Sequence, residues 1–188
     1  MKLWVYSSVA LYALALGATG QGMPGTNLTA FALVKVGDKF VSPKAKDQIT
    51  QIHSERSAGS LIPDIWYVDY FDPTTAFKTT EVKFIAGKMA EIRQPKHVLD
   101  AFSGTKKLRW KNMKVDSDRA LAMALQQPML KGLILQSAQY WLERTAAGST
   151  WRIRFWTSRP GKPAQVDDIG ELYISSKNGE ILKNELHF

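Results

Sequence analysis

The hexapeptide WRIRFW at residues 151–156 decides the fold, because large apolar and cationic side chains alternate along it. A period of two is typical of a strand with one buried face, so the odd-numbered residues are predicted to face the core. The even-numbered residues, Arg152, Arg154 and Trp156, then share the opposite face. A similar hexapeptide, WYVDYF, occupies residues 66–71. The sequence therefore predicts two equivalent strands.

The segments that follow these hexapeptides have a common order. Each hexapeptide precedes a loop and a second strand that begins with glutamate, at residues 81–84 and 171–174. Asn178 and Gly179 are typical of a tight hairpin turn, because both tolerate a positive φ, and this turn leads into a strand at residues 181–186. An internal repeat explains the shared order and predicts antiparallel pairing in both halves.

Helical periodicity is clearest at residues 116–127, where Ser117 is a candidate N-cap and apolar side chains recur every three or four residues. A strand at residues 133–144 is predicted to follow this helix. The first half has weaker counterparts, namely a strand within residues 47–56 and at best a brief helix at residues 42–46.

The second half resembles the PepSY domain, a small exported bacterial module in which a helix packs on an antiparallel sheet. The residues that carry the resemblance are the alanine-rich helix at 118–126, the strand at 151–156 and the segment ELYISSKNGEIL at 171–182. Ser175 stands where the family usually has an aspartate. The resemblance implies a non-catalytic envelope module that binds or restrains partner proteins, and the family supplies no catalytic residues.

These patterns together predict an α+β fold of two tandem helix-plus-antiparallel-sheet units, PepSY-like or cystatin-like. The first unit spans residues 30–95 and the second spans residues 115–188, with a basic connector at residues 96–114. A signal peptide at residues 1–20 and a flexible lead-in at residues 21–29 precede them.

The signal peptide is predicted from the order of residue types at the N-terminus. Lys2 precedes a largely apolar stretch, and the small residues 18–20 suit cleavage after Gly20. The alternative is a retained membrane anchor, but the apolar run is short for a span and polar residues interrupt it. We therefore expect an exported protein that is either periplasmic or secreted.

Composition narrows the chemistry. The chain has no cysteine, which excludes disulfides, thiolate metal sites and cysteine nucleophiles. An exported protein without disulfides fits a bacterial envelope. The formal net charge is +8, of which Lys2 supplies one, so acidic surfaces such as anionic lipids, cell-wall polymers or acidic proteins are plausible partners. Export disfavours nucleic acid as a partner.

No motif assigns a catalytic residue, a metal ligand or a cofactor. His53, His97 and His187 lack metal-ligand spacing and are interpreted as surface or edge-strand residues. Two groups of carboxylates leave open an acid–base hydrolase or a calcium site, although loop acids are usually only solvated. The groups are Asp64, Asp69 and Asp72 in the first half and Asp167, Asp168 and Glu171 in the second.

The connector sequence KKLRWKNMK at residues 106–114 is the most unusual surface feature, with five basic residues and one tryptophan. This composition suits an anionic membrane surface, a polyanion or an acidic partner. The alternative is a solvated linker whose tryptophan seals the interface between the units. The even-numbered face of residues 151–156 is a second candidate surface if it is open. The candidate binding residues are Lys106, Lys107, Arg109, Trp110, Lys111, Lys114, Arg152, Arg154 and Trp156.

The repeat also places Asp69 and Arg154 at equivalent positions of their hexapeptides. Opposite charges stabilise neighbouring strands, so we predict that the two hexapeptide strands lie close together. The two side chains are then expected within about 10 Å of each other, the range of direct attraction at ordinary ionic strength.

The predicted function is binding, with no chemistry of the protein's own. The expected partner is a protein or peptide that is engaged or restrained, for example along a sheet edge. The first alternative is a basic envelope-surface protein that holds anionic lipid or cell-wall polymer through residues 106–114. The second alternative is an acid–base hydrolase. The sequence predicts no oligomeric state.

Overall fold

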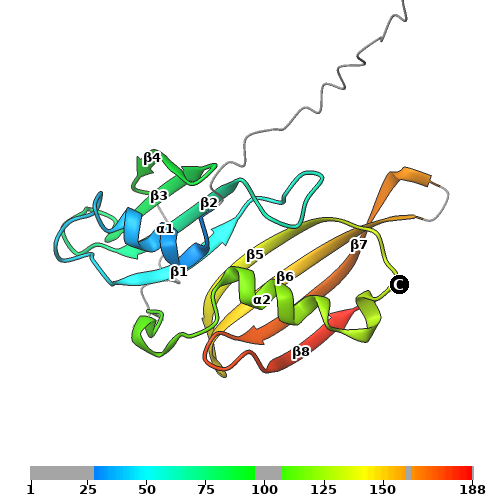
Figure 1. The fold of residues 1–188 in the computed structure, drawn as a ribbon. Coiled ribbons are helices and arrows are strands. Elements are labelled where there is room, and N and C mark those ends of the chain that lie inside the picture. Colours follow the sequence, from blue (N-terminus) through cyan, green and yellow to red (C-terminus); the bar gives the residue numbers. More distant parts are fainter. Residues whose placement is uncertain (1–27, 96–106, 160–161, 188) are drawn as a thin grey trace, which may run out of the picture.

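Eight antiparallel strands form one continuous sheet in the computed structural model, which describes residues 28–95, 107–159 and 162–187 (Figure 1). The strand order is β4-β3-β2-β1-β5-β6-β7-β8, so the chain builds each half of the sheet outward from the middle. The strands are β1 (Ile49–Ser54), β2 (Ile65–Phe71), β3 (Thr79–Ile85), β4 (Lys88–Arg93), β5 (Leu135–Thr145), β6 (Gly148–Arg159), β7 (Lys162–Ser175) and β8 (Ile181–Leu186). The helices are α1 (Ala30–Gly37), which precedes β1, and α2 (Ser117–Leu125), which precedes β5, with 3-10 turns η2 (Trp110–Asn112) and η3 (Pro128–Leu130) on either side of α2.

The predicted α+β fold of two tandem helix-plus-sheet units is wrong. Strands β1 and β5 pair with each other, with Ile52 opposite Leu142 and His53 opposite Trp141, so all eight strands belong to one sheet. The two helices span only eight and nine residues, which makes the fold sheet-dominated. Strand β1 is an edge of the first group of four strands, and β5 is an edge of the second group. The pairing of β1 with β5 satisfies the backbone hydrogen-bonding groups of both edges at once.

The predicted proximity of Asp69 and Arg154 is also wrong. Strands β1 and β5 lie between β2 and β6, which separates the two strands by three inter-strand spacings, roughly 14 Å in all. Each side chain instead has charged partners within its own half of the sheet. Asp69 lies near His53, and Arg154 lies near Asp168.

The two helix starts are joined to each other. Asp116 is the N-cap of α2, and its Oδ1 accepts hydrogen bonds from the N–H groups of Ser117 and Phe31. The Ser117 Oγ, predicted to cap its own helix, accepts the N–H of Ala30 at the start of α1. The start of α2 thus supplies side-chain acceptors for the first two amide groups of α1, which have no partner within α1 itself.

Helix α1 was not predicted, whereas the brief helix expected at residues 42–46 is a series of turns. The sequence of α1 is almost entirely apolar, and an isolated helix of this length is marginal in water. Packing on the sheet stabilises it: Leu33 and Val34 are buried, and the Tyr70 hydroxyl donates to the Val34 carbonyl at 3.2 Å.

One core fills the space between the helices and the sheet and crosses the boundary between the two halves. Trp66 packs on Tyr140 with ring centroids 5.5 Å apart, and Tyr140 packs edge-on against Trp151 at 6.4 Å. Both indole N–H groups are satisfied, because Trp66 donates to the Pro63 carbonyl and Trp151 donates to the Val115 carbonyl. The predicted buried face of the two hexapeptides is therefore confirmed.

Both helices cover the same face of the sheet (Figure 1). The opposite face carries no helix within residues 28–95, 107–159 and 162–187. We call it the helix-free face. No helix in these ranges is long and apolar enough to cross a bilayer.

Candidate functional site on the helix-free face

A row of side chains crosses the helix-free face, with one residue from each strand. The strand registers place these residues opposite one another in sequence from β4 to β8. We call this set the transverse row. Its members are Glu91, Lys83, Tyr67, His53, Trp141, Arg152, Tyr173 and Lys183.

Aromatic rings and cations alternate along much of the transverse row. The Arg152 guanidinium lies 3.9 Å from the centroid of the Trp141 ring, and the Lys183 ammonium lies 5.4 Å from the Tyr173 ring. In the first half, the His53 ring stacks on Tyr67 at 4.7 Å with an angle of 13° between the planes. The row therefore presents planar groups and charges, which suit contacts with polar and aromatic groups of a partner.

In the second half of the face, carboxylates accompany the cations. Arg152 lies 3.4 Å from Glu143 and 3.2 Å from Glu171. Arg154 forms an ion pair with Asp168 and lies 3.9 Å from Glu171. Partial burial raises the pKa of Asp168, but hydrogen bonds from Arg154 and the backbone outweigh it and hold this pKa below its usual value. These charges are thus matched within the protein.

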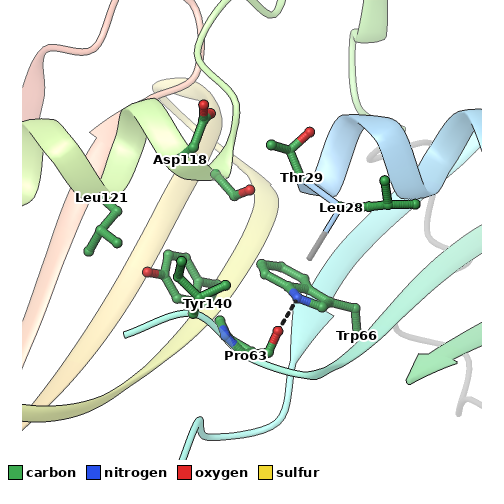
Figure 2. A pocket seen from close by; sticks show the side chains of 9 residues that line it. Leu28, Thr29, Pro63, Trp66, Asp118, Leu121 and Tyr140 are labelled. Atoms are coloured by element: carbon green, nitrogen blue, oxygen red, sulfur yellow. Dashed lines mark hydrogen bonds between the residues drawn. The ribbon is translucent and has the colours of Figure 1, made fainter. Parts of the chain in front are cut away.

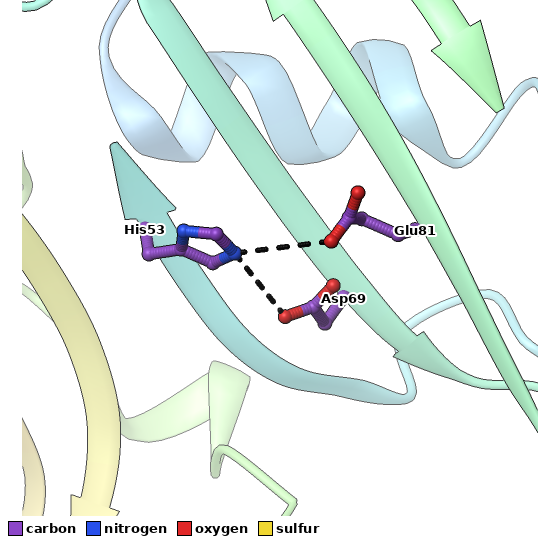
Figure 3. Close-up of side chains that lie close together, drawn as sticks. All are labelled: His53, Asp69 and Glu81. Atoms are coloured by element: carbon purple, nitrogen blue, oxygen red, sulfur yellow. Dashed lines mark ion pairs between the residues drawn. The ribbon is translucent and has the colours of Figure 1, made fainter. Parts of the chain in front are cut away.

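In the first half, His53 of the transverse row forms a cluster with Asp69 and Glu81, which lie beside the row (Figure 3). The His53 Nε2 is 3.6 Å from the Asp69 Oδ2 and 4.0 Å from the Glu81 Oε2. The Asp69 and Glu81 side chains are only 7% and 4% exposed. Burial, and then the adjacent Glu81, raise the pKa of Asp69 to about 8.

Two further features define this cluster, namely an ion pair of Glu81 and an oxygen of Asp69 without a partner in the described part of the chain. Arg93 on β4 pairs with the Glu81 Oε1, which leaves the Glu81 Oε2 facing His53. The Asp69 Oδ1 is buried and has no hydrogen-bond partner among the described residues. The cluster therefore offers one nitrogen and two carboxylates, with one oxygen unsatisfied.

The structure regroups the carboxylates that the sequence placed together. Asp69 belongs to the cluster, whereas Asp64 is exposed. Asp72 organises the loop after β2 by accepting hydrogen bonds from the hydroxyl groups of Ser42, Thr74 and Thr80.

In the second half, Asp168 and Glu171 both lie near Arg154. Asp167 lies opposite Thr157 across β6 and β7.

Two members of the cluster were missed by the sequence analysis. His53 lies on β1, a central strand between β2 and β5, and not at an edge. Glu81 was noted only as the start of a strand, and it faces Asp69 directly across β2 and β3. Strand parity alone places all three on a polar face, but only the register brings them together.

The predicted binding residues divide between two places. Arg152, Arg154 and Trp156 lie on the helix-free face, where the Arg56 guanidinium covers the Trp156 ring at 4.3 Å. Residues 107–114, the described part of the connector, instead lie at strand ends, with the Leu108 N–H bonded to the Ile49 carbonyl and the Lys114 N–H bonded to the Ser176 carbonyl. The structure does not join the two candidate surfaces into one.

The described side chains of the connector differ in exposure, because some pack on the protein and others face solvent. Trp110 packs edge-on against Phe31 of α1, with ring centroids 4.7 Å apart. The Lys107 ammonium donates to Gln48 and lies over the Phe71 ring. The exposed cations of the connector are Arg109, Lys111 and Lys114, and Lys106 and His97 lie outside the described residues.

A separate apolar pocket of about 290 Å³ opens where the two helix starts meet (Figure 2). Trp66 and Tyr140 line it from the sheet, and Leu28 and Leu121 line it from the helix side. Two polar groups of the lining are already bonded, because the Trp66 N–H and the Tyr140 hydroxyl donate to the carbonyls of Pro63 and Leu61. Thr29, Ser117 and Asp118 supply the remaining polar part of the lining.

Comparisons with models of known protein families, with curated proteins and with solved structures give no match. The resemblance to the PepSY domain stays a prediction.

Proposed function

We propose that this protein is an exported, non-catalytic binding protein of the bacterial envelope that holds a protein or peptide partner against its helix-free face. The observation that carries the proposal is the transverse row, which spans all eight strands on a face without a helix in the described ranges. Trp141, Arg152 and Tyr173 are half-buried there, so their planar groups are accessible yet held in place. Aromatic residues and arginine are enriched where proteins bind one another.

The balance of charge on this face favours a protein partner over a polyanion. Arg93, Arg152, Arg154 and Lys183 each lie within ion-pair distance of a carboxylate of the same face. A polyanion binds through cations that are free to neutralise it, and its binding weakens steeply with salt. The matched charges instead suit a partner that itself carries a mixture of polar, charged and aromatic groups.

The sheet edges support the same class of partner. Strands β4 and β8 each pair on one side only in the described part of the chain, and most of their side chains are exposed. An extended peptide can add to such an edge through backbone hydrogen bonds. A partner that contacts the helix-free face can therefore extend over either edge.

Site-specific crosslinking tests the proposal. A photoreactive phenylalanine derivative replaces Trp141 on the helix-free face, and in a matched control it replaces the exposed Arg119 on α2. We expect a defined envelope protein to crosslink at position 141 and not at position 119. The captured protein is then purified, and its affinity is measured for the wild type and for Trp141→Ala and Arg152→Ala, which are expected to weaken binding at least tenfold.

Salt separates the proposed partner from the polyanion alternative. Affinity for the purified partner is expected to change little between low and physiological ionic strength. Equal crosslinking at both positions, or steeply salt-dependent capture of lipid or cell-wall polymer, contradicts the proposal.

A further inference from the structure

We infer that His53, Asp69 and Glu81 form a binding site for a divalent transition-metal ion, with zinc as the best fit. The three ligand atoms lie within 4.8 Å of one another, on the adjacent strands β1, β2 and β3 (Figure 3). This inference goes beyond partner binding and does not depend on it.

The distances suit a small ion with tetrahedral coordination. Zinc binds histidine nitrogen and carboxylate oxygen at about 2.0–2.2 Å, which places neighbouring ligands about 3.4 Å apart. The His53 Nε2 is 3.6 Å from the Asp69 oxygen and 4.0 Å from the Glu81 oxygen. The ligands therefore need only a small inward movement.

A comparison with the other half of the sheet shows that the cluster lacks a positive charge. Glu171 on β7 lies opposite Arg154 on β6, so a carboxylate there faces a guanidinium. Glu81 on β3 lies opposite Asp69 on β2, so at the corresponding pair of strands a carboxylate faces a second carboxylate. Among the described residues, Arg93 pairs with Glu81, and Asp69 forms no ion pair with an arginine. A bound cation supplies the missing positive charge.

The unsatisfied oxygen of Asp69 is an independent indication of a ligand. The residue is 5% exposed, and its Oδ1 has no hydrogen-bond partner among the described residues. A buried carboxylate with an unpartnered oxygen is costly, and a cation bound at Oδ2, the oxygen nearer His53, neutralises the charge that Oδ1 shares. The three side chains point toward one another, which aims this carboxylate into the cluster (Figure 3).

Neighbouring side chains orient the ligands. Arg93 occupies the Glu81 Oε1 and leaves Oε2 for the ion, which makes Arg93 a positioning residue. The Tyr67 ring stacks in parallel on His53 at 4.7 Å and fixes the plane of the imidazole. His53 is 25% exposed, which leaves a path for the ion and for a water molecule in the fourth position.

The ligand set selects the class of ion. Calcium and magnesium prefer sites made entirely of oxygen and, for calcium, six to eight ligands. One imidazole and two carboxylates suit zinc and similar first-row ions. We therefore expect tight binding of zinc, weaker binding of manganese and no competition from magnesium or calcium.

Calorimetry on the chelator-treated, untagged chain tests the site. Zinc chloride is titrated into the wild type, with an expected stoichiometry of one tight site per chain. Asp69→Asn preserves shape and His53→Phe preserves the stacking on Tyr67, and each is expected to weaken zinc binding at least about 100-fold. Glu171→Gln and His187→Ala are matched controls on the other half of the sheet and are expected to bind zinc as the wild type does.

A spectroscopic readout keeps the result independent of stability. Cobalt(II) replaces zinc, and its visible absorption reports whether the ion is four-coordinate. The absence of a tight zinc site in the wild type overturns the inference, as does a site that Asp69→Asn and His53→Phe leave intact. Circular dichroism confirms that both variants are folded before either result is interpreted.

Discussion

The two halves of the helix-free face use the same strand arrangement for different electrostatics. In the second half, Arg154 faces Glu171 across β6 and β7. In the first half, Asp69 faces Glu81 across β2 and β3. The change from arginine to aspartate converts an internally neutralised pair into a pair of acids that lacks a cation. The glutamate on the pairing strand therefore has no fixed role, because the residue opposite it decides whether its charge is neutralised.

Burial increases the difference between the halves. The Arg154 side chain is 42% exposed and that of Glu171 is 15% exposed, so water screens their attraction. Pairs of this kind contribute only about 0–1 kcal/mol to stability. The side chains of Asp69 and Glu81 are 7% and 4% exposed, so water compensates their charges far less. We expect the first half to respond strongly to any change of charge and the second half to respond weakly.

Zinc is expected to produce the largest difference between the halves. At about 100 times its dissociation constant, a ligand that binds only the folded state adds about 2.7 kcal/mol to the free energy of unfolding. Urea unfolding with and without zinc measures this gain. We expect the full gain in the wild type and in Glu171→Gln, and none in Asp69→Asn. An equal gain in Asp69→Asn contradicts the assignment of zinc to the first half.

Removal of one arginine from each half gives the next largest contrast. With chelator present, Arg93→Ala leaves Glu81 buried beside Asp69 without its cation, and we expect a loss of about 2 kcal/mol. This value is below the usual cost of breaking a buried pair because Arg93 is itself half exposed. Arg154→Ala is expected to cost less than about 1 kcal/mol. Equal losses in urea unfolding contradict the comparison.

The substitution Asp69→Asn is expected to stabilise the metal-free protein. The change removes one of two adjacent buried carboxylates and preserves the shape of the side chain, so we expect a gain of about 1 kcal/mol at neutral pH in chelator. Asp168→Asn in the second half loses an ion pair with Arg154 and is expected to destabilise slightly. Opposite signs in thermal or urea unfolding support the contrast, and a loss in both variants contradicts it.

Acid is expected to reveal the smallest effect, in the second half. The pKa of Asp168 is held below its usual value, chiefly by Arg154, although partial burial acts in the opposite direction. Its carboxylate therefore contributes stability above about pH 4, and this contribution is lost as the pH falls through the lowered pKa. The difference in unfolding free energy between the wild type and Asp168→Asn is expected to shrink by less than about 1 kcal/mol between neutral and strongly acidic pH. A difference that grows in acid contradicts this.

Much of the local structure was predictable from sequence. Alternation in residues 66–71 and 151–156 identified β2 and β6 and their buried faces, and Asn178 with Gly179 identified the turn between β7 and β8. Helix α1 was not predictable in this way, because its apolar sequence lacks a polar face and its stability comes from packing on the sheet.

The candidate sites were predictable only in part. The polar face of residues 151–156 was identified as a possible platform, and its residues do lie on the helix-free face. The sequence did not connect His53 and Glu81 with Asp69. The three residues come from three different strands, and the sequence does not state the register of those strands. No spacing along the chain encodes this cluster.

The sequence by itself determined the strands at residues 66–71 and 151–156 and the buried face of each, because a period of two is a local property of the extended backbone. It did not show that β6 and β7 extend over most of the loop predicted after residue 156. Only the tertiary structure decided that β1 pairs with β5, that the sheet is continuous, and that Asp69 meets Glu81 while Arg154 meets Glu171. These outcomes depend on which strand edges pair and in which register. Several pairings between distant segments are available, and the pairing that gives the whole sheet the lowest free energy is the one that forms.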